Sequence, residues 1–183
     1  MTGQPHNEST SDVCTIVVGV DGSKPSIAAL RWALDEATRR GSTVHAVIAW
    51  QPEPRIGPDP IVGIPYQPEA EIRKMYAGEL AAAVTEAVTG HADQPVHEEV
   101  IRGWAPEVLV ERARGARLLV LGSHGRNWLV EKLLGSVSAY CVRHAPCPVV
   151  VIPAHLAGKP AEQSTKESEA DCRSAPSTPG PLL

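Results

Sequence analysis

The stretch from Gly122 to Ser136 has residue types and a spacing that can hold an anion without catalysing a reaction. Its pattern is Gly-x2-Gly-x9-Gly-Ser, and the apolar run 118–121 before it predicts a buried strand. A helix is predicted after Gly135 by four residues at helical spacing: Val137, Tyr140, Cys141 and His144. Glycines let backbone N–H groups approach an anion closely, and a helix N-terminus adds unpaired donors and the positive end of a dipole. The pattern therefore predicts a phosphate site between a strand and a helix.

Two glycines in a loop are also ordinary turn chemistry, in which case Gly122 and Gly125 would only reverse the chain. Two features favour the phosphate site. A third glycine, Gly135, stands directly before the predicted helix. A matching strand and turn occur at 17–23, which read Val-Val-Gly-Val-Asp-Gly-Ser.

From about Cys14 to Ile152 the chain resembles the universal stress protein family, in its ATP-binding branch. The glycine pattern, the Val-Gly-Val-Asp-Gly-Ser opening and the Ala-Pro-Cys-Pro-Val-Val-Val-Ile ending match that family in order and spacing. The resemblance implies an α/β fold of the adenine nucleotide alpha hydrolase type. Its doubly wound sheet would have five parallel strands in the order 3-2-1-4-5, with helices on both faces.

The composition is typical of one globular domain: 183 residues, 43% hydrophobic and 21% charged, with a net charge of −4. An acidic balance does not suggest a nucleic-acid partner. No apolar run is long enough to span a bilayer, so we expect no membrane partner and a cytoplasmic location. The four cysteines form no C-x-x-C pair, which argues against a zinc site or a disulfide framework.

We expect three segments: a flexible N-terminal segment at 1–11, a universal stress protein domain at 12–155 and a disordered tail at 156–183. A second Asp-Gly-Ser turn or Gly-x2-Gly loop is absent from the sequence, so we expect a single-domain form.

Apolar and β-branched runs predict strands at 15–20, 43–50, 96–102, 117–121 and 149–152. Helical periodicity predicts helices between 25 and 40, at 68–89, at 105–114 and after Gly135. The inward residues of the first helix are predicted to be Ile27, Leu30, Leu34 and Ala37. Those of the second are predicted to be Ile72, Met75, Tyr76, Leu80, Ala83, Val84 and Ala87. The proline-rich segment 51–67 predicts a long loop.

Ligands of open α/β sheets bind beyond the carboxyl ends of the strands, where the strand order reverses. The implied order places Asp21 and the Gly122 loop on opposite sides of that crevice. A carboxylate accepts hydrogen bonds from hydroxyl or amino groups and repels phosphate, so Asp21 is predicted at the nucleoside end. Alternatively, Asp21 and Ser23 only cap the first helix. The complete glycine loop favours binding.

The resemblance implies nucleotide contacts at the two strand ends, beside the adenine and around the phosphates. They fall on Val20, Asp21, Ala49, Leu121, Gly122, Ser123, Gly125, Arg126, Gly135, Ser136, Val137 and Ser138. Ser136 could also cap its helix, because its hydroxyl and its N–H are different groups. His124 and Arg126 are weaker candidates, since loop side chains of this kind often point to solvent.

The sequence carries no G-x-x-x-x-G-K-[ST] loop, and Asp21 is the acid that can be placed in the crevice. We therefore predict an ATP-binding stress-response or regulatory protein with no catalytic residues and at most slow hydrolysis, the ATP arriving with or without Mg²⁺. The alternatives are a cyclic AMP sensor and an interaction module with a vestigial site.

The last predicted strand is entirely apolar: Val149, Val150, Val151 and Ile152. The implied strand order puts it at a sheet edge, and an exposed apolar edge promotes association unless something covers it. The resemblance points to pairing through this strand. We therefore expect a homodimer. The alternative is that the C-terminal tail folds back over the edge.

Overall fold

The computed structural model describes residues 15–51, 68–89, 94–124, 134–153 and 156. Five parallel strands form one sheet in the order β3-β2-β1-β4-β5, as predicted. The strands are β1 (Thr15–Gly19), β2 (Thr43–Trp50), β3 (Val96–Arg102), β4 (Leu118–Gly122) and β5 (Val149–Ile152). The helices are α1 (Lys24–Arg40), α2 (Glu69–Ala87), α3 (Ala105–Arg112) and α4 (Ser136–His144).

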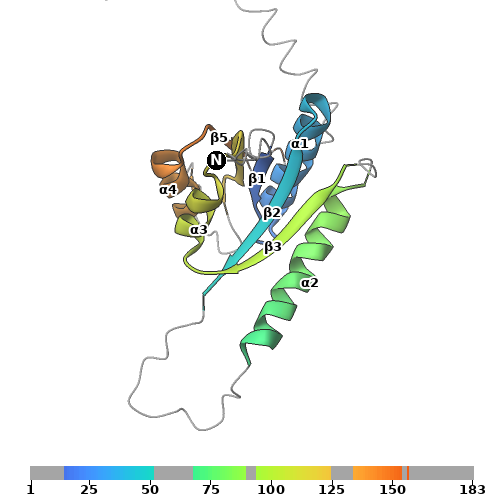
Figure 1. The fold of residues 1–183 in the computed structure, drawn as a ribbon, viewed down its shortest axis with the longest axis vertical. Helices are drawn as coiled ribbons and strands as arrows, with labels where there is room; N and C mark the ends of the chain where they lie inside the picture. Colours follow the sequence, from blue (N-terminus) through green and yellow to red (C-terminus); the bar gives the residue numbers. More distant parts are fainter. Residues whose placement is uncertain (1–14, 52–67, 90–93, 125–133, 154–155, 157–183) are drawn as a thin grey trace, which may run out of the picture.

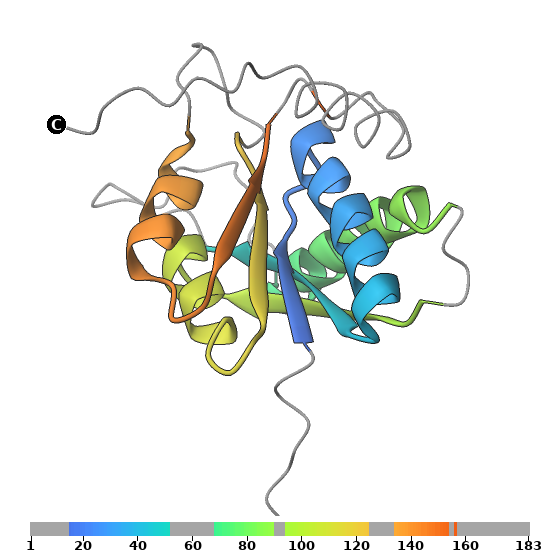
Figure 2. The ribbon, with the colours of Figure 1, turned by 90° about the horizontal axis from the view of Figure 1, so that it is seen from above.

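Helices α1 and α2 cover one face of the sheet, and α3 and α4 cover the other (Figures 1 and 2). Alternating side chains of β1 explain the two layers. Ile16 and Val18 pack toward α1 and α2, whereas Val17 packs toward α3 and α4. Because β1 is buried on both faces, its run of branched residues is a consequence of its central position.

Local signals fix both ends of α1. The Ser23 hydroxyl accepts a hydrogen bond from the Ser26 N–H at 3.3 Å, and Pro25 stands in the first turn. Gly41 ends the helix in the left-handed conformation, with φ of 63°. The predicted capping role of Ser23 is therefore observed.

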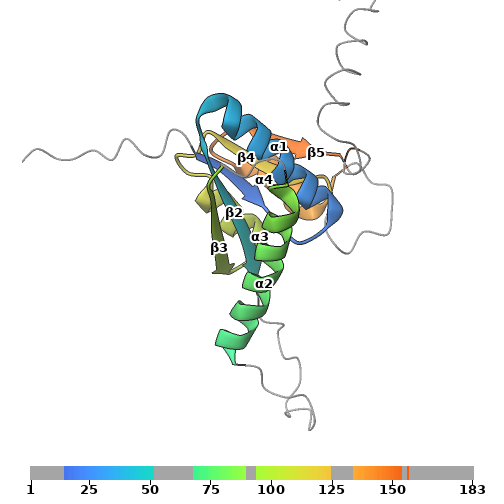
Figure 3. The ribbon, with the colours of Figure 1, turned by 90° about the vertical axis from the view of Figure 1, so that its right-hand side faces the viewer.

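The predicted inward stripe of α2 was wrong at Met75, whose side chain is 50% exposed. The buried residues of α2 all lie in its second half: Leu80, Ala83, Val84 and Ala87. Figure 3 shows the first turns of α2 projecting beyond the strands. Helical periodicity identifies a face of the helix, but it does not show how far along the helix the sheet extends.

None of the helices in the described segments is both long enough and apolar enough to cross a membrane. Of the predicted tail, the structure describes Leu156, which packs against the core on the α1 and α2 face of the sheet. The rest of the tail, and the Gly125 and Arg126 positions, lie outside the described residues.

Cys141 is buried between α3 and α4, where its Sγ lies 4.0 Å from the carbonyl oxygen of Pro106. Burial disfavours the thiolate and raises the pKa of the Cys141 thiol to about 11. We therefore predict that iodoacetamide at pH 8 leaves Cys141 unmodified in the folded protein and alkylates it in urea, as measured by peptide mass spectrometry. Equal alkylation rates in both conditions would contradict the buried position.

Candidate functional site

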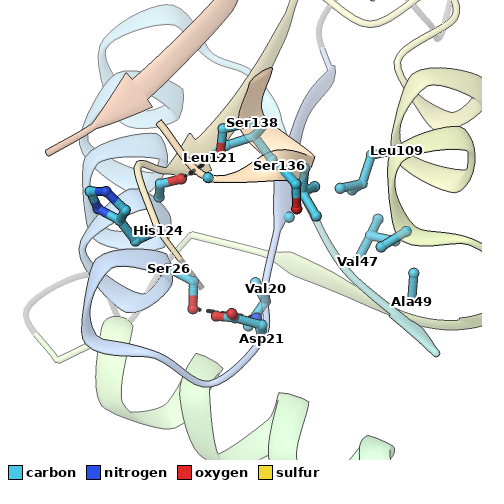
Figure 4. A pocket seen from close by; sticks show the side chains of 15 residues that line it. Val20, Asp21, Ser26, Val47, Ala49, Leu109, Leu121, His124, Ser136 and Ser138 are labelled. Carbon is cyan, nitrogen blue, oxygen red and sulfur yellow. Dashed lines mark hydrogen bonds between the residues drawn. The ribbon is translucent and has the colours of Figure 1, made fainter. Parts of the chain in front are cut away.

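A cavity of about 460 Å³ opens at the carboxyl ends of β1, β2 and β4 (Figure 4). Residues from the ends of these strands and from the first turns of α1, α3 and α4 form its walls. They are Gly19, Val20, Asp21, Ser26, Val47, Ala49, Ala105, Leu109, Leu121, Gly122, His124, Gly135, Ser136, Val137 and Ser138.

Most of the predicted contact residues share this one cavity. Those that line it are Val20, Asp21, Ala49, Leu121, Gly122, Gly135, Ser136, Val137 and Ser138. Ser123 is buried beside the cavity, at 4% exposure, but is not part of the lining. Its N–H donates to the Ile152 carbonyl at 2.8 Å, so Ser123 ties the end of β4 to β5.

Asp21 holds the turn between β1 and α1. Its Oδ1 accepts hydrogen bonds from the Ser23 N–H at 3.0 Å and from the Ser23 hydroxyl at 2.6 Å. Its own N–H donates to the Ser26 hydroxyl at 3.3 Å (Figure 4). Asp21 thus supports the cap of α1 and also lines the cavity, so the two alternative roles are compatible in this geometry.

Gly122 is required for a reason that the sequence did not reveal. A Cβ at this position would lie 2.8 Å from the carbonyl carbon of Pro25 and 2.9 Å from the Ser26 nitrogen. The end of β4 therefore touches the backbone of the first turn of α1, which leaves no room for a side chain. Close approach to a ligand need not be the reason for this glycine.

The first turn of α4 supplies the N–H donors of the cavity. Gly135 precedes it, and the Gly135 N–H donates to the Ser123 carbonyl at 2.7 Å. The Ser138 hydroxyl donates to the Gly122 carbonyl at 2.7 Å, which fastens α4 to β4. The N–H groups of a helix's first turn have no intrahelical acceptor and carry partial positive charge. No acidic residue occupies this turn, so nothing in it neutralises that charge.

The opposite wall is apolar. Figure 4 shows Val47, Ala49 and Leu109 gathered on one side of the cavity, with Leu121 and Ser136 beyond them. One cavity thus offers an apolar surface at one end and helix N–H groups at the other. That combination suits a ligand with a flat, largely apolar part and an anionic part.

Sequence analysis missed five of the lining residues: Gly19, Ser26, Val47, Ala105 and Leu109. Two signals could have found some of them. Val47 lies two residues before Ala49, on the same face of β2. Ala105 begins the helix that follows β3, and all helices that follow parallel strands begin at the same sheet edge. His124, a weaker candidate in the sequence, lines the cavity as well.

A second cavity, of about 210 Å³, lies near the amino ends of β1 and β2, beside the last turn of α3. Glu99 bridges two side chains there: its carboxylate lies 3.1 Å from His45 Nδ1 and 3.0 Å from the Arg112 guanidinium. Glu111 and Arg114 of the same lining pair with each other at 2.6 Å, so each carboxylate that lines this cavity has an arginine partner. Among the described residues, no cluster of three or more His, Cys, Asp or Glu side chains could hold a metal ion.

The sequence profile of the universal stress protein family matches residues 14–153. The chain belongs to the universal stress protein family. It is 35% identical over 137 residues to a universal stress protein of Mycolicibacterium smegmatis, covering 75% of this chain and 45% of that protein. It is 36% identical over 136 residues to one of Mycobacterium tuberculosis, covering 74% and 44%. The chain therefore spans less than half the length of these curated relatives.

Solved universal stress proteins share this fold. A universal stress protein in complex with cAMP is 27% identical, with a TM-score of 0.55, and the match covers 76% of this chain and 95% of that one. The universal stress protein of Archaeoglobus fulgidus in complex with dAMP is 24% identical, with a TM-score of 0.55, and the match covers 75% and 96%. These likenesses confirm the predicted architecture.

The contact of Gly122 with α1 gives a test of how this universal stress protein domain builds its cavity. Gly122→Ala should lower the free energy of unfolding by roughly 1–3 kcal/mol, because the new methyl group meets backbone atoms that cannot move aside cheaply. Urea unfolding followed by circular dichroism measures the change.

Gly78 is the matched control, since it lies on α2 with nothing within 4 Å of an added Cβ. Gly78→Ala should raise the free energy of unfolding by about 0.5–1 kcal/mol through the better helix propensity of alanine. If Gly122→Ala were as stable as the wild type, the close contact would be refuted.

Proposed function

We propose that this domain binds ATP and acts as a nucleotide-dependent regulatory or stress-response protein. One observation carries the proposal: an apolar wall and the N-terminus of α4, whose first turn holds no acidic residue, share a single cavity of about 460 Å³. That volume lies within the usual range for small-ligand sites, roughly 300–1,000 Å³.

In this proposal the adenine lies against Val47, Ala49 and Leu109, where apolar side chains exclude water. The ribose hydroxyls donate to the Asp21 carboxylate. The phosphates lie at the first turn of α4, where helix N–H groups favour negative charge. Gly125 and Arg126, which lie outside the described residues, would complete the phosphate site, as the sequence pattern predicts.

We propose binding rather than rapid chemistry. Among the described lining residues, Asp21 is the one carboxylate, and its Oδ1 is occupied by Ser23. Phosphoryl transfer usually needs several acidic or amide groups that hold Mg²⁺ and place the nucleophile. Any Mg²⁺ would therefore enter on the phosphates of ATP, as this ion commonly does. At most slow hydrolysis is expected.

Cyclic AMP is the second candidate ligand. The observation that favours it is the likeness, at 27% identity, to a universal stress protein whose structure contains cAMP. The same apolar wall could hold its adenine, and its single phosphate would need fewer N–H donors than a triphosphate.

Mass spectrometry of nucleotides released from the purified protein would distinguish these possibilities, with calorimetry to rank ATP, cAMP and GTP. The proposal predicts that ATP co-purifies and binds more tightly than cAMP and GTP. Tighter cAMP binding would favour the sensor. Binding of none of the three would favour a vestigial site in an interaction module.

Asp21→Ala should weaken ATP and adenosine alike, by roughly the 1.5–3 kcal/mol typical of a hydrogen bond to a charged group. Calorimetry or ligand-observed NMR measures both affinities. The loss should be equal for the two ligands because the carboxylate contacts the part that they share.

Ser23→Ala is the matched control for Asp21, because it removes the hydroxyl that caps α1 and leaves the carboxylate in place. It should cost about 1 kcal/mol of stability and little affinity. Unchanged ATP affinity in Asp21→Ala would show that Asp21 serves only the cap.

We also propose a homodimer through β5, which is an edge strand of the described sheet. Val150 packs against the core between the sheet and helices α1 and α2, and Val149 packs against the core between the sheet and helices α3 and α4. Val151 is partly exposed and belongs to neither core. A two-fold pairing would satisfy the edge N–H and C=O groups and cover Val151.

Val151→Lys should convert the dimer to a monomer, because it places a charge on the paired edge. Light scattering at micromolar concentration measures the mass. Val142→Lys is the control, since Val142 lies on α4 and is already 52% exposed. A monomeric wild-type protein would contradict the dimer.

A further inference from the structure

Three aromatic rings connect the start of α3 to α4. The Trp104 ring meets the Tyr140 ring edge to face, with centroids 4.9 Å apart and planes at 69°. Tyr140 in turn stacks on His144 at 4.1 Å. Trp104 is 43% exposed, which is unusual for so large an apolar side chain. The stack therefore lies at the surface, where burial in the core does not account for it.

The Trp104–Tyr140 contact lies beside both halves of the cavity, namely the apolar wall and the N–H groups at the start of α4. Trp104 directly precedes Ala105, which belongs to the lining together with Leu109 of the same helix. Tyr140 lies one helical turn after Ser136, whose turn supplies the N–H groups. The contact thus links α3, which contributes Leu109 to the apolar wall, to α4, which contributes the N–H groups.

Helices α3 and α4 also pack against each other in the interior, where Leu109, Val137 and Cys141 belong to one apolar cluster. Deeper in the layer, Cys141 Sγ lies 4.0 Å from the Pro106 carbonyl. Leu109 packs with Val17 and Val47, whereas Ser138 is bonded to Gly122 of β4. The aromatic contact thus adds a surface link between α3 and α4 to this interior packing, at the end of α3 that borders the cavity.

We propose that Trp104 and Tyr140 are positioning residues that set the separation between the apolar wall and the N–H groups of α4. The inference rests on the proposed nucleotide function and extends it to two residues outside the lining. A ligand that touches both halves gains affinity when their separation is already correct, because less ordering accompanies binding. A ligand that touches one half gains nothing from that separation.

The binding test compares ATP, which spans both halves, with adenosine, which contacts only the apolar wall and Asp21. Trp104→Ala should weaken ATP about twofold to tenfold, the range that an aromatic pair contributes, and leave adenosine unchanged. Trp104→Phe keeps an aromatic edge and should restore ATP affinity. Val142→Ala, on the exposed side of α4, is the matched control and should change neither affinity.

A double variant shows whether the two rings act together. Tyr140→Ala in the Trp104→Ala background should cost no further ATP affinity, because the contact is already lost. Additive losses, or a loss of adenosine affinity equal to that of ATP, would overturn the proposal.

A ligand-free measurement separates this inference from the proposed function. Backbone NMR order parameters of Ser136, Val137 and Ser138 should fall in Trp104→Ala and stay at wild-type values in Trp104→Phe and Val142→Ala. Unchanged order parameters in Trp104→Ala would overturn the positioning role, whatever the protein binds. A wild-type protein that binds no ATP would refute the proposed function, and the order parameters would still decide the role of Trp104.

Discussion

The contact between the end of β4 and the first turn of α1 is the constraint on which the candidate site depends. Gly122 leaves no space for a side chain against Pro25 and Ser26, so two segments that are distant in sequence meet backbone to backbone. This contact lies where the strand order turns from β2-β1 to β4-β5. The crevice beside it is open because helices leave β1 and β4 on opposite faces of the sheet.

The parallel arrangement of the strands explains why the N-termini of several helices, with their backbone N–H donors, gather at this crevice. Each helix that follows a strand begins at the same sheet edge, so the first turns of α1, α3 and α4 all reach the cavity. Two hydrogen bonds then fix the start of α4 to the end of β4. Ser138 is bonded to the Gly122 carbonyl, and Gly135 to the Ser123 carbonyl. The N–H groups of α4 are consequently held in place before any ligand arrives, which is the condition for strong anion binding at a helix terminus.

Much of this could be predicted from the sequence, because the signals are local. Branched runs marked the strands, and Ser23 and Gly41 marked the ends of α1. The errors concern relations between segments. Met75 satisfies the helical period but lies beyond the reach of the sheet. The sequence pattern identified Gly122 as part of the glycine loop. It did not predict the contact with Pro25, because Pro25 lies on α1, which follows β1 and not β4. Leu109 carries no motif, and only the packing of α3 places it in the cavity lining, with Trp104 outside the lining at the start of the same helix.

The central claim is that an adenine nucleotide binds between the apolar wall and α4 with its phosphates at the first turn of that helix. Titration of isotope-labelled protein with ATP, followed by amide NMR shifts, tests it most directly. The account predicts the largest shifts at Asp21 and at Ser136, Val137 and Ser138. Thr15 and Gly115, which line the second cavity, should not respond. Shifts concentrated at the second cavity, or an α4 that does not respond to saturating ATP, would contradict the account.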